Sequence, residues 1–295
     1  MLVAISHYIW NFSKQAHQSK TPQLVTLAYS HYVESARWSL EYGGIKFQET
    51  GYAPGQHILP TLSIRIDRTG KKHFSNSSSV ADIPGKTKNS PTSSPVMVHP
   101  DGSIDRDSWE ISARANLKPI DSDLKDLLDK EFGPLCRQWV YFYLLKPEHS
   151  NIFSAMCTDG RHWFWKMLWN LGFGNILTEK MVALFDSHNE MTKKQCVVKL
   201  EVIIEKLSTI LRTRPGKFLG GDELGQADIA LASLCGAIIF PDLYAGGLMT
   251  PFVHQMKNKD KEFSQEVERW RKTEVGSYCM DLYSQWRLAK ITRKN

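Results

Sequence analysis

Cysteine is missing from the first 135 residues of this 295-residue chain. The chain has five cysteines and no CxxC pair: Cys136, Cys157, Cys196, Cys235 and Cys279. An odd number of cysteines without paired spacing disfavours a disulfide scaffold and fits a reducing compartment. We therefore expect a cytoplasmic protein.

A long hydrophobic run is also missing. The most apolar stretch, residues 229–240, contains Ser233 and Gly236 and stops at Pro241. A bilayer-spanning helix needs about 20 apolar residues, so this stretch predicts a buried helix and no stable membrane insertion.

Charge of one sign is not concentrated anywhere in the chain. The formal net charge is +6, and Lys and Arg are spread along the whole sequence. This distribution favours a solvated basic surface over a nucleic-acid-binding stripe, so we expect no nucleic-acid partner. His57, His73 and His99 lack the spacing of metal ligands, so we expect no bound metal.

The N-terminal segment has no acidic residue before Glu34, which is one property of an organelle-targeting peptide. Residues 1–20 also lack Arg, and their apolar stretch is broken by Ser6 and His7. A short tail before the first strand is the alternative interpretation, and both stay open.

An α/β unit is predicted near the start of the chain. Residues 24–29 form a short apolar run, typical of a buried strand. Residues 32–42 then change to helical spacing, and Gly43-Gly44 marks the helix end. Residues 45–49 alternate apolar and polar, which predicts a second strand parallel to the first.

A polar insertion and a hairpin follow. Residues 63–94 are rich in Ser, Lys, Asn, Gly and Pro, so we expect a loop or a partly disordered insertion. Residues 95–99 and 103–105 read as a hairpin around the turn at 100–102. A helix then begins, with Asp107 or Ser108 as its N-cap.

The rest of the chain has helical periodicity. Beyond about residue 120 apolar side chains recur at steps of three and four, as in residues 197–211. We therefore predict two domains, an α/β domain over residues 22–117 and an α-helical domain over residues 122–290.

Three local features could bind a ligand together. Ser30 stands where the first strand meets its helix, so it either caps that helix or gives a hydrogen bond to an anion at the helix N-terminus. Pro95 opens a strand, which requires an edge position or a cis bond. With a cis bond, the main chain of Val96 or Met97 would be available to a peptide ligand. Asp107-Ser108 opens a second helix that could receive a carboxylate.

Three stretches in this order resemble the glutathione transferase superfamily of the serine type. They are SHYVESARWSLEYGGI, SPVMVHPDGSIDRDSWEI and GKFLGGDELGQADIALASL, at residues 30–45, 94–111 and 216–234. The resemblance covers about residues 22–240. It implies a thioredoxin-like N-terminal domain followed by an α-helical C-terminal domain.

The resemblance also implies roles for individual residues. Ser30 would hydrogen-bond the glutathione sulfur, and Pro95 would be a cis proline. Val96 or Met97 would pair through the main chain with the cysteinyl unit of glutathione. Asp107 and Ser108 would receive its γ-glutamyl end.

One further residue has a structural role under the resemblance. Asp228 matches the Asp of a helix-capping box in the second domain, although Gly225 replaces the usual Ser or Thr. The polar insertion lies where contacts to glutathione normally continue.

The implied activity is transfer of the glutathione thiolate to an electrophilic hydrophobic compound, with glutathione as co-substrate. The absence of cysteine before Cys136 disfavours glutaredoxin-like and dehydroascorbate-reductase-like chemistry, which needs a protein thiol. The alternative is a non-catalytic protein of the same fold that binds a hydrophobic ligand or a protein partner.

Two further expectations concern the assembly and the aromatic residues. A homodimer is expected only from the resemblance. The aromatic run at residues 161–169 either lines a substrate pocket or packs in the core.

Overall fold

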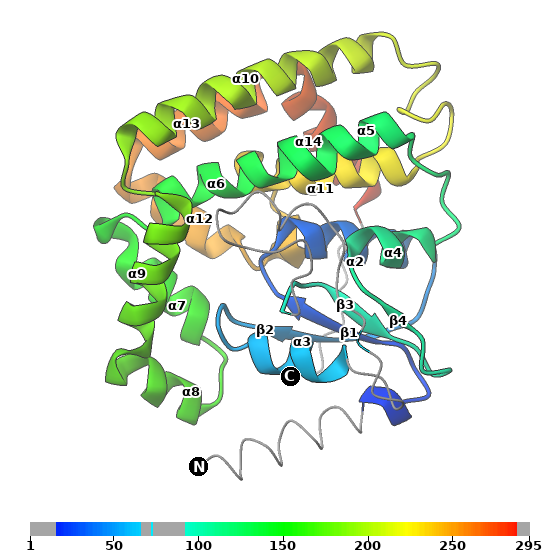
Figure 1. The fold of residues 1–295 in the computed structure, drawn as a ribbon. Helices are drawn as coiled ribbons and strands as arrows, with labels where there is room; N and C mark the ends of the chain where they lie inside the picture. Colours follow the sequence, from blue (N-terminus) through cyan, green and yellow to red (C-terminus); the bar gives the residue numbers. More distant parts are fainter. Residues whose placement is uncertain (1–15, 66–71, 73–91, 288–295) are drawn as a thin grey trace.

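A computed structural model describes residues 16–65, 72 and 92–287 (Figure 1). The N-terminal segment 1–15, most of the expected insertion and His73 lie outside the described residues. The first part contains β1 (Gln23–Leu27), α2 (His31–Tyr42), β2 (Gln48–Tyr52), α3 (Ile58–Ile64), β3 (Val96–Val98), β4 (Ile104–Asp105) and α4 (Ser108–Ala113).

Helices make up the rest of the described chain. They are α5 (Ser122–Asp126), α6 (Gly133–Leu144), α7 (Ser150–Thr158), α8 (Trp163–Leu168), α9 (Gly174–Phe185), α10 (Glu190–Arg212), α11 (Gln226–Ile239), α12 (Thr250–Lys259), α13 (Lys261–Arg271) and α14 (Glu274–Trp286). Short segments join some of them: η2 (Leu127–Phe132) and η4 (Trp169–Phe173) are π-helical, and η3 (Pro147–His149) and η5 (Tyr244–Gly247) are 3-10 turns.

The four strands form one mixed sheet in the order β2-β1-β3-β4. β1 and β2 are parallel, as predicted for strands joined by a helix. β3 runs antiparallel to β1 and pairs with β4 in the predicted hairpin. The turn of that hairpin contains Gly102 with φ +86°, a conformation that glycine adopts without strain.

The sheet is covered on both faces because side chains alternate along each strand. Leu24 and Met97 pack with Ala36 of α2 and Ile111 of α4 on one face. On the other face the valines of β1 and β3 pack with Ile64 of α3. Figure 1 shows α3 below the sheet and α2 and α4 above it, between the sheet and the other helices.

Two strand predictions need correction. β2 covers Gln48–Tyr52 rather than residues 45–49, because the Ile45 N–H still bonds the Leu40 carbonyl at the end of α2. Ile45 and Phe47 pack against the core from the connection instead. β3 is an interior strand between β1 and β4, so the edge alternative for Pro95 is wrong, whereas the Ser94–Pro95 bond is cis as predicted.

α11 is the central helix of the second part. Every one of its residues is buried, which confirms the buried helix predicted for this stretch. It packs against α2 of the α/β part as well as against α6 and α14. Within the described ranges, no helix has the length and apolar character needed to cross a bilayer.

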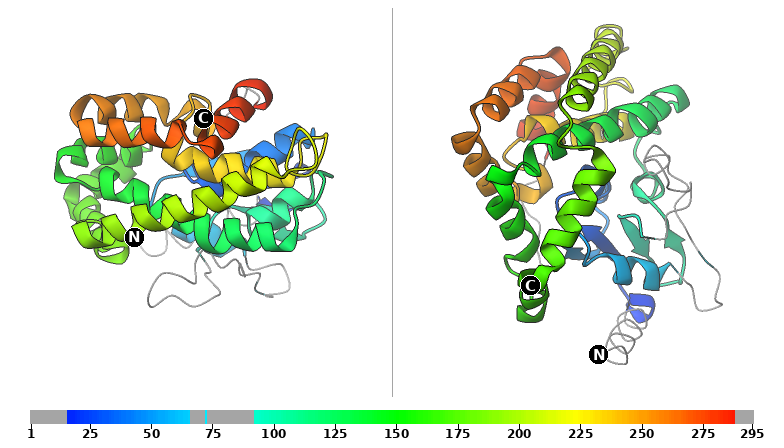
Figure 2. Two further views of the ribbon diagram at one scale, coloured as in Figure 1. Left: turned by 90° about the horizontal axis from the view of Figure 1, so that it is seen from above. Right: turned by 60° about the vertical axis from the view of Figure 1, so that its left-hand side comes forward.

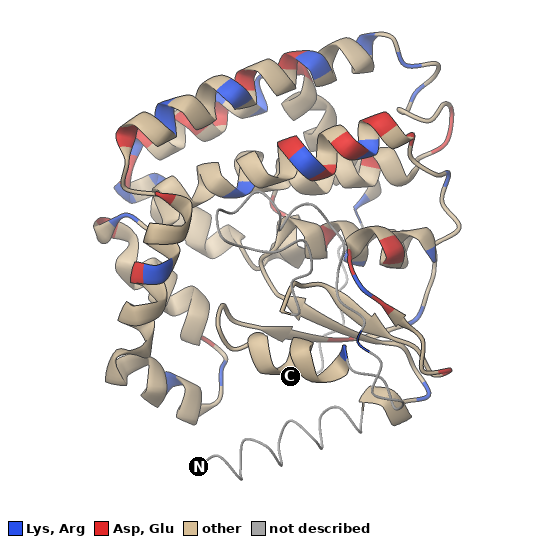
Figure 3. Cartoon of the chain, viewed as in Figure 1, with Lys and Arg blue, Asp and Glu red and all other residues tan. Residues whose placement is uncertain are grey.

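α13 also packs against α11, whereas α7, α8 and α9 gather at one side of the helical part (Figure 2). Lys and Arg alternate with Asp and Glu along the outer helices α10 and α13 (Figure 3). The predicted fold class, a thioredoxin-like α/β domain followed by an all-α domain, is confirmed by this order of elements.

Candidate functional site

Ser30 lies between the end of β1 and the start of α2. Its backbone is extended, with φ −75° and ψ 134°, and its carbonyl accepts from the Glu34 N–H at 2.9 Å, so it occupies the N-cap position. Its hydroxyl makes no capping hydrogen bond. Ser30 is thus the N-cap of α2 by its backbone, as the capping interpretation predicts, but its hydroxyl does not satisfy the helix. The hydroxyl lies at a helix N-terminus whose dipole favours an anion.

The cis-proline segment lies beside the same end of β1. Ser94 Oγ accepts a hydrogen bond from the Leu27 N–H at 2.8 Å, three residues before Ser30. This bond fixes the segment that precedes Pro95 next to the strand–helix junction. Two of the three predicted features, the serine and the cis proline, are thus brought together.

A cavity of about 350 Å³ opens at this junction. Ser30, Ser93, Ser94 and His57 line it from the α/β part. Its apolar wall comes mainly from the helices: Val140, Tyr141, Leu144, Phe153, Met156, Leu177, Met181, Leu184, Phe185, Phe240 and Met249. The Tyr244 hydroxyl donates to the Tyr29 carbonyl at 3.2 Å and connects the two sides. A polar end beside a larger apolar wall suits an amphipathic ligand.

His31 follows Ser30 and also lines the cavity. Burial, together with the nearby positive charge of Arg137, lowers the pKa of His31 to about 3. The ring is therefore neutral at pH 7, and its Nε2–H donates to the Gly133 carbonyl at 3.0 Å. Such a ring is too weak a base to ionise a thiol beside Ser30, so the hydroxyl and the helix N-terminus are the groups that can act there.

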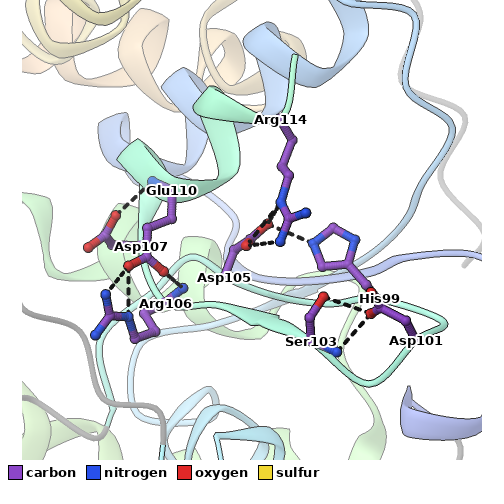
Figure 4. A network of polar contacts seen from close by, with 8 residues as sticks. All are labelled: His99, Asp101, Ser103, Asp105, Arg106, Asp107, Glu110 and Arg114. Carbon is purple, nitrogen blue, oxygen red and sulfur yellow. Dashed lines mark hydrogen bonds and ion pairs between the residues drawn. The ribbon is translucent and has the colours of Figure 1, made fainter. Parts of the chain in front are cut away.

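Asp107 and Ser108 do not line the cavity. Asp107 is the N-cap of α4, and its carboxylate accepts from the N–H groups of Trp109 and Glu110 at 3.0 Å each. Figure 4 shows Asp107 beside Glu110 and Arg106. Burial raises the pKa of Asp107, and these two hydrogen bonds oppose that rise. Ser108 is buried as the first residue of α4.

Arg65 connects the start of α4 to the cavity wall. One guanidinium nitrogen donates to the Ser93 carbonyl at 2.8 Å, to Ser93 Oγ at 2.9 Å and to the Arg106 carbonyl at 2.8 Å. Burial lowers the pKa of Arg65 to about 10, which still leaves the guanidinium charged at pH 7. The segment that carries Asp107 is therefore fastened directly beside Ser93.

Val96 and Met97 are buried in β3, and neither lines the cavity. Met97 has strand partners on both sides, Leu24 and Asp105, whereas the β3–β4 ladder does not reach Val96. The cavity residues of this segment are Thr92, Ser93 and Ser94, which the sequence patterns do not predict. Their signal is their place directly before a cis proline, at the open end of the strand.

The aromatic run divides between surface and core. Trp163 and Phe164 are 66% and 37% exposed, whereas Trp169 is buried and Trp165 packs against the core. No residue of the run lines the cavity beside Ser30.

All five cysteines are free and buried, and none of them lines that cavity. A thiol at this site would have to come from a ligand. Among the described residues, no group of three His, Cys, Asp or Glu side chains is placed to hold a metal ion.

Comparisons with known proteins find similarity among solved structures only. No family model and no curated protein matches the sequence. Among solved structures, a glutathione S-transferase of Ceriporiopsis subvermispora in complex with glutathione is 13% identical, with TM-score 0.47 over 92% of this chain and 99% of that one. A glutathione transferase of Phanerochaete chrysosporium in complex with oxidized glutathione is 9% identical, with TM-score 0.47 over 90% and 98%. One from Methylobacillus flagellatus, with glutathione bound, is 14% identical, with TM-score 0.38 over 88% and 98%.

These identities and TM-scores carry no argument about activity. The assignment of the fold rests on features of this chain: the β2-β1-β3-β4 order, the cis Ser94–Pro95 bond and the helices that follow α4. With these features in this order, the chain has a thioredoxin-like α/β domain followed by an all-α domain.

Proposed function

We propose that the chain binds glutathione and transfers its thiolate to an electrophilic hydrophobic compound. The observation that carries the proposal is the Ser30 hydroxyl, which does not cap its own helix and lines a cavity with an apolar wall. The thiol loses its proton to solvent, and the sulfur then bonds to the electrophilic carbon as the leaving group departs.

The Ser30 hydroxyl and the N-terminus of α2 can supply the free energy that is needed to lower the pKa of the glutathione thiol. Lowering a thiol pKa of roughly 8.5 by two units requires about 2.7 kcal/mol of preferential thiolate stabilisation. A hydrogen bond to a charged group contributes about 1.5–3 kcal/mol, and a helix N-terminus adds about 0.3–1 kcal/mol. Ser30 and the start of α2 together cover this range.

The proposal assigns the rest of glutathione to the residues predicted from the sequence. The cysteinyl unit lies along the cis-proline segment, by the main chain of Val96 or Met97 and beside Ser94. The γ-glutamyl end extends toward Asp107 and Ser108, and the link through Arg65 between Ser93 and Arg106 supports that direction. The electrophile takes the apolar wall contributed by the helices.

A second candidate function is binding without chemistry. The observation that favours it is the Asp107 carboxylate, which is already occupied by two N–H groups of its own helix and stays off the cavity. In that case the cavity holds an apolar ligand, and glutathione does not bind.

Calorimetric titration with glutathione separates the two candidates. The proposal expects saturable binding, followed by conjugation of an aromatic electrophile. Ser30→Ala should keep the glutathione dissociation constant within a few-fold but lose the ultraviolet absorbance of the bound thiolate, because only the charged sulfur depends on the hydroxyl. Ser108→Ala should weaken glutathione binding about ten- to hundredfold, the value of a charge-assisted hydrogen bond.

Two results would overturn the proposal. A flat titration of the wild-type protein leaves only the binding function. An equal thiolate signal in wild type and Ser30→Ala removes Ser30 from its role.

A further inference from the structure

The aromatic run of α8 and η4 has one side that packs inside the protein. Trp165 Nε1 donates to the Cys157 carbonyl at 2.9 Å. Trp169 Nε1 donates to Ser154 Oγ at 2.9 Å, and the ring centres of Trp169 and Phe173 are 6.5 Å apart. Trp165, Trp169 and Phe173 follow one another at steps of four residues, so they share one side of the segment and fasten it to α7.

The opposite side of the same segment is apolar as well, but it is exposed. Trp163, Met167 and Leu171 follow the same four-residue step, and their exposed fractions are 66%, 39% and 75%. Phe164 contacts Trp163 edge to face, with the ring centres 5.9 Å apart, and Ile176 near the start of α9 is 53% exposed. A helix that is apolar on all sides is ordinarily buried, so this outer side suits contact with an apolar surface. We call these five side chains the apolar apex.

The charges near the apolar apex have one sign. Residues 160–178 contain Arg161 and Lys166 but no Asp or Glu. Arg161 donates to the Gly51 carbonyl, a neutral group, and Lys166 is exposed, so neither positive charge is matched by a carboxylate within this stretch. Figure 3 shows blue and no red on α8, whereas both colours alternate along α10. Exposed aromatic side chains beside cations, without anions, are typical of segments that bind the surface of a lipid bilayer.

This charge favours a membrane over a second copy of the chain as the partner. A two-fold contact would place the apolar apex against itself, and Arg161 and Lys166 would then face cations of the same kind. An anionic lipid surface instead attracts both residues, while tryptophan, phenylalanine and leucine side chains enter the boundary between headgroups and acyl chains. In Figure 1, α8 lies at the lower end of the helical part, away from the mixed charges of α10 and α13.

We propose that the apolar apex is a docking site for a membrane surface that contains anionic lipids. Trp163, Phe164 and Leu171 insert into the headgroup boundary, and Lys166 remains at the level of the lipid phosphates. The binding is peripheral, because no helix in the described ranges could cross a bilayer. No residue of the apex lines the cavity beside Ser30, so this inference stands apart from the proposed transfer of glutathione.

Cosedimentation of the full chain with lipid vesicles tests the proposal. Vesicles of phosphatidylcholine with about one third phosphatidylserine should bind the wild-type protein more tightly than phosphatidylcholine alone, and added salt should weaken that binding. Leu171→Ser should weaken it about tenfold, because the side chain no longer buries apolar surface in the lipid. Val198→Ser, at a position of α10 that is 57% exposed, is the matched control and should bind like wild type.

A pair of lysines tests the role of charge. Lys166→Gln should weaken binding to the anionic vesicles about fivefold and leave binding to phosphatidylcholine unchanged. Lys206→Gln, at an exposed position of α10, should change neither. If wild type, Leu171→Ser and Lys166→Gln bind both kinds of vesicle equally, or if the wild-type protein binds no vesicle, the proposal is wrong.

Two controls separate lipid binding from misfolding and from self-association. Thermal unfolding should be nearly the same in wild type and Leu171→Ser, because this side chain is 75% exposed; if Leu171→Ser does not fold, Met167→Ser takes its place in the vesicle assay. Sedimentation velocity over a range of protein concentrations tests a second copy as the partner. Self-association that Leu171→Ser abolishes, without binding of the wild type to vesicles, would assign the apex to a contact between copies and overturn the proposal.

Discussion

Asp105 shows how one carboxylate joins the hairpin to the end of α4. Its side chain is 7% exposed and lies 2.6 Å from His99 Nε2 and 2.8 Å from an Arg114 guanidinium nitrogen (Figure 4). Burial alone would raise the pKa of Asp105, but the hydrogen bonds from His99 and Arg114 outweigh it and lower the pKa below its usual value of 3.8. The ionised form therefore stabilises the folded state.

The pH dependence of stability follows from this sign. A carboxyl whose folded pKa is lowered stabilises fully above its unfolded pKa of about 3.9, and the contribution is lost as the pH falls through the folded value. Asp105→Asn should reduce the free energy of unfolding by about 1–3 kcal/mol at pH 7. Urea unfolding of both proteins should show this difference shrinking below about pH 4, where the wild-type carboxyl takes up its proton.

An exposed aspartate provides the control for that measurement. Asp126 pairs with Lys130 on the surface of α5, with its side chain 59% exposed. Asp126→Asn should change stability by less than about 0.5 kcal/mol. A difference for Asp105→Asn that stays constant between pH 7 and pH 3 would contradict the role of its charge.

At the scale of elements, one side chain in the first turn of α11 connects the start of this helix to two other segments. Asp228 Oδ2 accepts from the Gly225 N–H at 3.0 Å, and Oδ1 accepts from the Leu219 N–H at 2.8 Å and from the Tyr278 hydroxyl at 2.5 Å. The bond to Gly225 confirms that Asp228 closes the start of the helix without a hydroxyl in return. The other two bonds extend its role to the preceding loop and to α14.

Removing this carboxylate should destabilise the whole helical part. Asp228→Ala leaves one buried donor and two partly buried donors without their acceptor, and we expect a loss of about 3 kcal/mol in the free energy of unfolding. Asp228→Asn keeps one acceptor oxygen and should lose less. Glu223→Ala, at an exposed position in the same loop, is the control. Equal stability of Asp228→Ala and Glu223→Ala would show that another contact fixes the start of α11.

Sequence patterns predicted those elements whose signals are local. The switch from the apolar run to helical spacing gave β1 and α2, and the turn at residues 100–102 gave the hairpin. The predicted position of β2 is wrong because its residues, Gln48 to Tyr52, are mostly polar. Within β2, the Glu49 carboxylate accepts hydrogen bonds from Arg37 and Thr26, which are distant in the sequence. Such long-range pairing leaves no periodicity in the sequence.

The candidate site shows the same limit at the scale of the whole molecule. Ser30 and Pro95 were predictable from their places at a helix start and a strand start. Arg137 and Tyr244 reach the cavity only because α6 and the segment after α11 fold back over the junction. Asp107 has a carboxylate that could bind a ligand, but only the structure shows that this carboxylate caps its own helix.

The helix that carries Ser30 is joined to the far end of the chain by a buried ionic network. Arg37 bonds Glu34 at 2.8 Å and Glu49 at 2.6 Å, and Arg287, after α14, bonds Glu34 at 2.7 Å and also pairs with Glu41. Three carboxylates thus share two guanidinium groups. Burial raises the pKa of Glu41, and the charge of Arg287 opposes that rise.

Replacing Arg287 should therefore cost stability in a pH-dependent way. Arg287→Met leaves buried carboxylates with less compensation, and we expect a loss of about 3–5 kcal/mol at pH 8. Without Arg287, the pKa of Glu41 in the folded state should be even higher. Above this pKa, keeping Glu41 ionised costs stability. As the pH falls and the carboxyl takes up a proton, this cost disappears. Urea unfolding should show a smaller loss of unfolding free energy at pH 5 than at pH 8. Adding Glu41→Gln to Arg287→Met should recover part of the loss.

The control is Arg212→Met, which breaks exposed pairs with Glu205 and Glu274 and should cost less than about 1 kcal/mol. If Arg287→Met behaves like Arg212→Met at both pH values, the network does not hold α2 to the end of the chain, and the position of Ser30 depends on packing against α11 alone.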